Sequence, residues 1–463
     1  MLTRATPRLL YSTVAVAGHA TSMRRRHELR FEPGVTPGSA HFGGKSMILD
    51  SLLALGLLLS TATQLRFGDT PFGPGEMCLA IWLGLLLCLQ AGRLAPASNA
   101  AFTVVVAFWL ILFVAESVGA IVGFATELFF DTTEIMHDVI AYLFLFCLAC
   151  AMALELNGAH RLRRMTWLIA LFSAASLSLQ LAHAYGLIRL PVAADPWFYD
   201  RLRGWSNDPN QLGFATASLT LVSIHLADTA TQRAKATAAA ACAVLAFCVG
   251  VLTKSDSFAV GILGASAVFL AIKSSLWLAT FKRGLTFRAA LVSLALLGLP
   301  VLAVGALPLA PAVVERVEAK SAALYAEDNQ GDLRFHLWEE AYDKGMQAAM
   351  LGLGPGPHLT KKAWKQSPPH KFEAHNTPLD LFVQGGLMAL LAIAMLYASL
   401  LVATTKAKLP ALAALSCAFV VFSMFHFIIR HPIFWFGVVL CLLEAASVSR
   451  CSFGGKQAEF VRL

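Results

Sequence analysis

Residues 101–124 read AFTVVVAFWLILFVAESVGAIVGF, and Glu116 is the single charged residue among them. An apolar run of this length suffices for an α-helix to cross a bilayer, which takes about 20 residues. Similar runs recur along the 463-residue chain, in which 57% of residues are hydrophobic and 14% are charged. Soluble domains carry about 25% charged residues, so this composition excludes a water-soluble globule, a disordered chain and a coiled coil. The sequence therefore predicts an all-α integral membrane protein.

The apolar runs predict about twelve transmembrane helices, with one large loop between the ninth and the tenth. Their expected ranges are 47–66, 75–92, 101–124, 135–156, 165–188, 210–228, 235–254, 257–279, 288–309, 376–403, 410–429 and 432–449. The expected organisation is a cytoplasmic tail at 1–46, disordered or an over-extended gene start; helices one to nine at 47–309; a large periplasmic loop with an amphipathic helix at 310–375; helices ten to twelve at 376–449; and a cytoplasmic tail at 450–463.

The net charge of +8 would suggest a nucleic-acid partner in a soluble protein, but here its distribution indicates membrane topology. Basic residues such as Arg161, Arg163 and Arg164 lie in loops on one side, whereas early loops on the other side carry Asp69 and Glu76. By the positive-inside rule both termini are cytoplasmic, and no nucleic-acid partner is expected. Of the nine cysteines, only Cys451 lies outside an apolar run, so neither a disulfide framework nor a metal site is expected.

Two outer segments keep basic residues against this bias, which makes them candidate anion sites. In the first, 189–211, Arg203 precedes Gly204 and a helix start at Pro209 and Asn210, where Asn210 can act as the helix cap. On spacing alone, a capped helix start with an arginine at the membrane interface is favoured over a phosphate site. The turn holding Ser255 and Ser257 can cap the eighth span or contact a sugar, and capping alone explains it.

The second outer segment is the long loop, where residues 333–342 predict a helix. Its expected apolar face comprises Leu333, Leu337, Trp338, Ala341 and Tyr342.

Residues 351–357 of the same loop, LGLGPGP, follow no strand and contain two prolines, so they predict a turn and not a dinucleotide fingerprint. The loop ends at His375, before a candidate helix cap at Asn376. On an outer face shared with Arg203 and Arg334, neutral His375 can serve as a general base while the arginines hold a diphosphate leaving group.

Four ionisable residues fall inside predicted spans: Glu116, His183, His225 and His426. Such residues are functional candidates in membrane proteins. They keep open the alternative of a transporter for a solute or a lipid-linked glycan. However, they are scattered, and the two halves of the chain show no visible repeat, as inverted-repeat transporters often would. A structural subunit of a polysaccharide assembly complex is a third possibility.

In its motifs the chain resembles the superfamily of O-antigen ligases and Wzy-type O-antigen and exopolysaccharide polymerases, which are bacterial inner-membrane proteins. The shared features are an Arg-Gly…Pro-Asn…Gly segment, a serine-rich turn, an Arg…Trp helix, a Gly-x-Gly-x-Gly turn, an Ala-His-Asn sequence and a Gly-Gly pair. They are found here at Arg203, Gly204, Pro209, Asn210 and Gly213; at Ser255–Ser257; at Arg334 and Trp338; at Gly352, Gly354 and Gly356; at 374–376; and at Gly385 and Gly386. Asp256 stands where many relatives have an arginine.

The resemblance implies transfer of a glycan, without a metal or other cofactor, from an undecaprenyl-diphosphate carrier to a hydroxyl on lipid A core or on a second lipid-linked glycan. The first acceptor would make the protein a ligase in lipopolysaccharide biosynthesis, and the second a polymerase. His375 would be the catalytic residue. Donor binding would fall to Arg203 and Arg334, with Arg201, Asn210 and Asn376 as further candidates. Ser255, Ser257 and Trp338 are candidate glycan contacts.

Overall fold

The computed structural model describes residues 43–67, 72–90, 99–126, 132–189, 194–280, 330–360 and 371–460. The chain divides into two units, Met1–Leu49 and Asp50–Leu463, and the second contains all the helices discussed below apart from the start of the first. Every predicted span within these ranges overlaps a helix, whereas the ninth, 288–309, lies outside the described residues. The helices are α2 (Gly43–Leu59), α3 (Pro74–Gln90), α4 (Ala100–Thr126), α5 (Thr132–Glu155), α6 (Ala159–Ala184), α7 (Pro209–Thr229), α8 (Arg233–Leu252), α9 (Asp256–Thr280), α12 (Gln330–Gln347), α13 (Thr377–Lys406), α14 (Pro410–Ser423) and α15 (Pro432–Phe460).

Short elements complete the described part of the chain: two 3-10 turns, η1 (Thr63–Leu65) and η3 (Ile428–Arg430), and two antiparallel hairpins. One hairpin pairs β1 (Trp197–Phe198) with β2 (Arg201–Leu202), and the other pairs β3 (Leu359–Thr360) with β4 (Lys371–Phe372). Seven described helices are long and apolar enough to cross a membrane, and three shorter helices are also apolar. The protein is therefore an all-α, multi-pass membrane protein.

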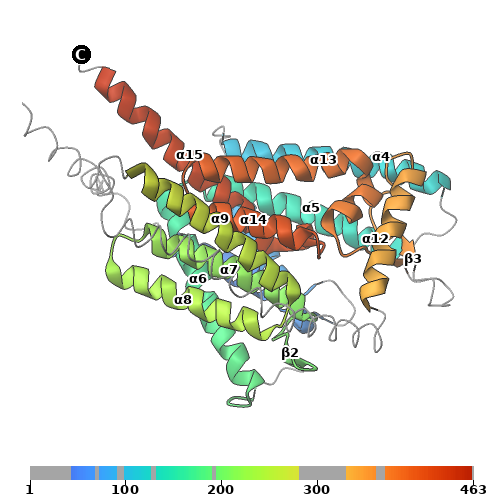
Figure 1. The fold of residues 1–463 in the computed structure, drawn as a ribbon, viewed down its shortest axis with the longest axis horizontal. Coiled ribbons are helices and arrows are strands. Elements are labelled where there is room, and N and C mark those ends of the chain that lie inside the picture. The colour runs from blue at the N-terminus through green and yellow to red at the C-terminus, as the bar shows by residue number, and fades with distance from the viewer. Residues whose placement is uncertain are drawn as a thin grey trace, which may run out of the picture. The chain divides into compact units, whose positions relative to one another are not determined.

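Helix α7 forms the core around which α8, α9 and α14 pack (Figure 1). Almost its whole length is buried, although it is rich in hydroxyl residues. The hydroxyls of Thr216, Ser218 and Thr220 donate to backbone carbonyls one turn earlier, at 2.8, 2.9 and 2.7 Å. These internal hydrogen bonds satisfy the polar groups without water, which allows a moderately polar helix to sit at the centre of the bundle.

Two helix boundaries differ from the prediction. Asp208, and not Asn210, caps α7, because its carboxylate accepts the Asn210 N–H at 2.9 Å while Pro209 occupies the first helical position. Helix α14 ends at Ser423 rather than near 429, so His426 lies in the loop between α14 and α15 and not inside a span. The predicted cap at Asn376 is confirmed, since its Oδ1 accepts the Leu379 N–H at 3.2 Å.

The glycine-rich segment is a turn, as predicted, and it packs against a kink in α13 formed by Gly385 and Gly386. The Gly354 N–H donates to the Gln384 carbonyl at 2.8 Å, where the kink has exposed that acceptor. A Cβ on Gly119 of α4 would lie 2.3 Å from the same carbonyl oxygen. Glycines on three segments thus permit close backbone contact, which fixes the end of the large loop against the bundle.

Candidate functional site

The segments that enter α7, α9 and α13 meet the loop between α14 and α15 at one end of the bundle. Side-chain hydrogen bonds join them: Asn210 to Ser255, Ser257 to His426, and Thr377 to the His426 backbone. We call Arg201, Asn210, Ser255, Ser257 and His426 the polar cluster. Several residues singled out in the sequence therefore lie together, although they are far apart along the chain.

At one side of this cluster, Arg201 is held by two acceptors. Its Nη2 donates to Asn210 Oδ1 at 3.0 Å and its Nε to the Thr253 carbonyl at 3.2 Å. Ser255 Oγ donates to the same Asn210 oxygen at 2.8 Å. The guanidinium is consequently fixed between the start of α7 and the turn before α9, and both of these hydrogen bonds, among the described residues, are to neutral groups.

Arg203 lies in a different environment from Arg201. Its Nη2 pairs with Asp195 Oδ2 at 3.1 Å, and its Nε donates to the Asp195 carbonyl at 2.9 Å. Its guanidinium carbon also lies 5.5 Å from the centre of the Phe198 ring. The carboxylate already compensates the charge of Arg203, so Arg201 is the better placed of the two for an anionic ligand.

His426 lies at the other side of the cluster, where its Nε2 is 3.2 Å from Ser257 Oγ. Its pKa is lowered to about 3, first by burial and further by the positive charges of Arg334, His431 and His375, against an opposing effect of Asp208. The imidazole is therefore neutral near pH 7. Hydrogen bonds from the Thr377 hydroxyl to the His426 carbonyl and from the Trp338 indole to the Ala374 carbonyl bring the segments that carry His375 and Arg334 to the polar cluster. Sequence reasoning flagged His426 only as an ionisable residue inside a span.

His375 is exposed and has a φ of +52°, which is uncommon for a residue with a Cβ. The carboxylate of Asp380 holds this conformation by accepting the N–H groups on either side, Ala374 at 2.6 Å and Asn376 at 3.0 Å. The Asn376 side chain in turn donates to the Met424 carbonyl at 3.0 Å. Backbone strain that the surroundings enforce is frequent at functional sites, and here it presents an imidazole to the outside.

Helix α12 carries Arg334, and it crosses one end of α13 and contacts β3 (Figure 1). Its buried stripe contains Leu337 and Ala341, as the sequence predicted, but Tyr342 is 55% exposed. Tyr342 lies at the edge of the buried stripe, where it stacks on Phe382 at 6.4 Å between ring centres.

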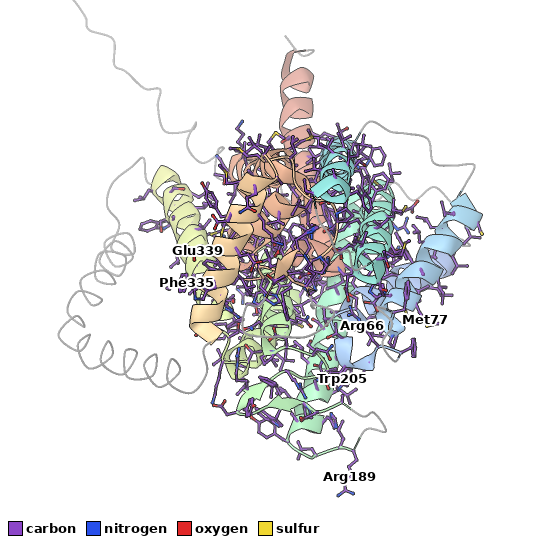
Figure 2. All side chains as sticks on the ribbon, turned by 90° about the vertical axis from the view of Figure 1, so that its right-hand side faces the viewer. Arg66, Met77, Arg189, Trp205, Phe335 and Glu339 are labelled. Carbon is purple, nitrogen blue, oxygen red and sulfur yellow. The ribbon has the colours of Figure 1, made fainter. Side chains whose placement is uncertain are left out.

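The indole of Trp338 donates to the Ala374 carbonyl at 3.0 Å, which ties the Arg334 helix to the residue before His375. Phe335 and Glu339, labelled on this helix in Figure 2, are exposed, as is Arg334.

Sequence reasoning missed Arg430, which lies in η3 between the last two helices. Its Nη2 pairs with Asp138 at 2.6 Å and its Nη1 with Glu373 at 2.5 Å. The available signal was its position, since it is another arginine on the predicted outer side.

Of the ionisable residues assigned to spans, Glu116, His183 and His225 lie on three different helices. Within the described ranges, no group of three His, Cys, Asp or Glu residues could hold a metal ion.

Residues 241–394, which carry part of this geometry, match the family described as O-antigen ligase, Wzy_C. This stretch belongs to the O-antigen ligase family. The match confirms the resemblance to the superfamily of O-antigen ligases and Wzy-type polymerases. The general activity of that superfamily is glycan transfer of the ligase or polymerase type. None of the curated proteins matches the chain.

The O-antigen ligase domain at 241–394 contains Ser255, Ser257, Arg334, Trp338, His375 and Asn376. Arg201 and Asn210 precede it, and His426 and Arg430 follow it. The hydrogen bonds of the polar cluster therefore connect the matched domain to α7, which precedes it, and to the loop between α14 and α15, which follows it.

Proposed function

We propose that this protein transfers a glycan from an undecaprenyl-diphosphate carrier to an acceptor hydroxyl at the periplasmic face of the bacterial inner membrane. The observation that carries the proposal is the convergence of Arg201 and of the segments that carry Arg334 and His375 at the polar cluster, within and beside an O-antigen ligase domain. This reaction needs cations that hold the diphosphate, and it needs an imidazole that accepts a proton.

In the proposed reaction, the acceptor hydroxyl oxygen forms a bond to the anomeric carbon of the donor glycan. The bond between that carbon and the diphosphate oxygen breaks, and the carrier diphosphate leaves with the electron pair. His375 accepts the hydroxyl proton and later releases it to solvent. Arg201 and Arg334 stabilise the negative charge on the departing diphosphate, with Arg203 and the amides of Asn210 and Asn376 as further donor contacts. Ser255, Ser257 and Trp338 are proposed contacts to the glycan.

Purified protein in detergent, supplied with an undecaprenyl-diphosphate-linked oligosaccharide, tests the proposal directly. Lipid A core as acceptor reports ligase activity, and a second lipid-linked oligosaccharide reports polymerase activity; a gel shift of either acceptor shows transfer. We expect product with one acceptor and at least a hundredfold lower rate for His375→Ala and Arg334→Ala. The matched controls are His336→Ala and Arg163→Ala. His336 is an exposed histidine on α12, and Arg163 lies near the start of α6, at the end of that helix away from the polar cluster. No product with either acceptor, or full activity of both site variants, would overturn the proposal.

A further inference from the structure

Arg430 bridges two carboxylates that belong to distant parts of the chain. Asp138 comes from α5 and is 3% exposed, and Glu373 comes from the end of the large loop. The ion-pair distances of 2.6 and 2.5 Å use two different nitrogens of one guanidinium. A planar guanidinium can hold two partners in a fixed geometry in a way that a lysine ammonium cannot.

The bridge also joins the two segments that carry the site imidazoles. Glu373 lies two residues before His375. On the other side, the Arg430 guanidinium carbon lies 4.5 Å from the centre of the Phe427 ring, adjacent to His426. Two hydrogen bonds continue the connection, because Thr377 Oγ1 donates to the His426 carbonyl at 2.5 Å and accepts the Ile428 N–H at 3.0 Å.

Asp138 extends the bridge to the glycine-rich turn. The Asp138 Oδ2 that pairs with Arg430 also accepts the Gly356 N–H at 3.0 Å. One buried carboxylate on a membrane helix thus anchors both the loop after α14 and the glycine turn of the large loop. The printed contacts of this network are with Glu373 and Gly356 and with the segment after His426, so it can act on the imidazoles through the backbone segments that carry them.

We propose that Arg430, held by Asp138 and Glu373, is a positioning residue that fixes the His375 and His426 segments relative to each other for the transfer step. This inference rests on the proposed function. A displacement of about 1 Å in a reacting group can lower a rate about a hundredfold, so a bridge that controls the separation controls turnover.

The chain offers a matched control for a purely structural role. At the opposite end of the helices, Arg161 also bridges two carboxylates: Asp50, at 3.1 Å, and Glu155. Asp50 is fully buried, as Asp138 nearly is. A bridge that only stabilises the fold would be equally important at either end, whereas a positioning role is confined to Arg430.

The first experiment compares Arg430→Lys and Glu373→Gln with Arg161→Lys and Glu155→Gln in the transfer assay. We expect kcat to fall at least tenfold for the Arg430 and Glu373 variants, with KM for the lipid-linked donor changed less than twofold. The Arg161 and Glu155 variants should keep a kcat within twofold of wild type. Unchanged kcat in the first pair, or an equal fall in both pairs, would overturn the inference.

A second experiment does not depend on activity. Diethyl pyrocarbonate acylates accessible neutral imidazoles, and peptide mass spectrometry gives the rate for each histidine. Loss of the bridge should expose the partly buried His426, so Arg430→Lys should raise its modification rate at least threefold, and Arg161→Lys should not. An inactive wild type would refute the proposed function alone. Equal His426 rates in wild type and Arg430→Lys would refute the positioning role.

Discussion

At the residue scale, the two arginines of the β1–β2 hairpin differ in what compensates their charge. Arg203 is paired with the carboxylate of Asp195, whereas Arg201 contacts an amide and a carbonyl. An anion that binds Arg203 must compete with Asp195, but one that binds Arg201 has no such competitor among these contacts. We therefore expect Arg201→Ala to raise KM for the lipid-linked donor at least tenfold, and Arg203→Ala to raise it less than threefold. Steady-state kinetics with purified variants measure both, and the reverse order would contradict this assignment.

The half-buried imidazole of His426 also makes stability depend on pH. Its pKa in the folded protein is about 3, compared with about 6.5 in an unfolded chain, so unfolding takes up a proton below pH 6.5. The stabilisation is complete above pH 6.5 and is lost progressively as the pH falls toward 3. His426→Gln keeps a polar partner for Ser257 without a titrating ring.

As the pH is lowered from 7.5 to 4.5, the midpoint temperature of thermal unfolding in detergent should therefore fall less steeply for this variant than for wild type. His431, whose pKa is lowered to about 4 mainly by burial, leaves a residual slope in both proteins. A steeper or unchanged slope in His426→Gln would show that His426 is not buried in its neutral form.

At the element scale, hydropathy predicts helices because a bilayer imposes their length and apolar character. It cannot locate the end of α14. The residues after Ser423 include Phe425, Phe427 and Ile428, which prolong the apolar run. The helix ends there because Thr377 binds the His426 carbonyl and the Ile428 N–H, a tertiary contact across about 50 residues that no local pattern encodes. For the same reason, spacing could neither separate Arg201 from Arg203 nor indicate that Arg430 binds Asp138.

The contact between the glycine turn and the α13 kink should tolerate no side chain. Gly386 has a φ of +63°, and a Cβ there would lie 2.1 Å from the Met350 carbonyl oxygen. Gly386→Ala should therefore destabilise the protein by about 2 kcal/mol or more, through backbone strain and overpacking. Gly84 in α3 is the control, because a Cβ there meets nothing within 4 Å. Thermal unfolding should show a lower midpoint for Gly386→Ala and an equal or higher midpoint for Gly84→Ala.

At the scale of the whole molecule, the two ends of the bundle use arginines differently. At the end formed by the start of α6, Arg161 and Arg164 both pair with the buried carboxylate of Asp50, so their charges anchor helices. At the other end, Arg201 is free of a carboxylate partner in its hydrogen bonds and Arg334 is exposed near His426. From the positive-inside rule we expect the first end to face the cytoplasm and the second to face the periplasm.

This orientation predicts the outcome of reporter fusions. Alkaline phosphatase, which is active only outside the cytoplasm, should be active when fused after Gln347, the last residue of α12. Green fluorescent protein, which fluoresces when it folds in the cytoplasm, should be fluorescent when fused after Arg164. The converse fusions, phosphatase after Arg164 and fluorescent protein after Gln347, are the controls and should be silent. In the proposed reaction a lipid-linked donor reaches His375 and Arg334 from the side on which α12 lies. The opposite pattern would therefore place the polar cluster in the cytoplasm and exclude transfer at the periplasmic face.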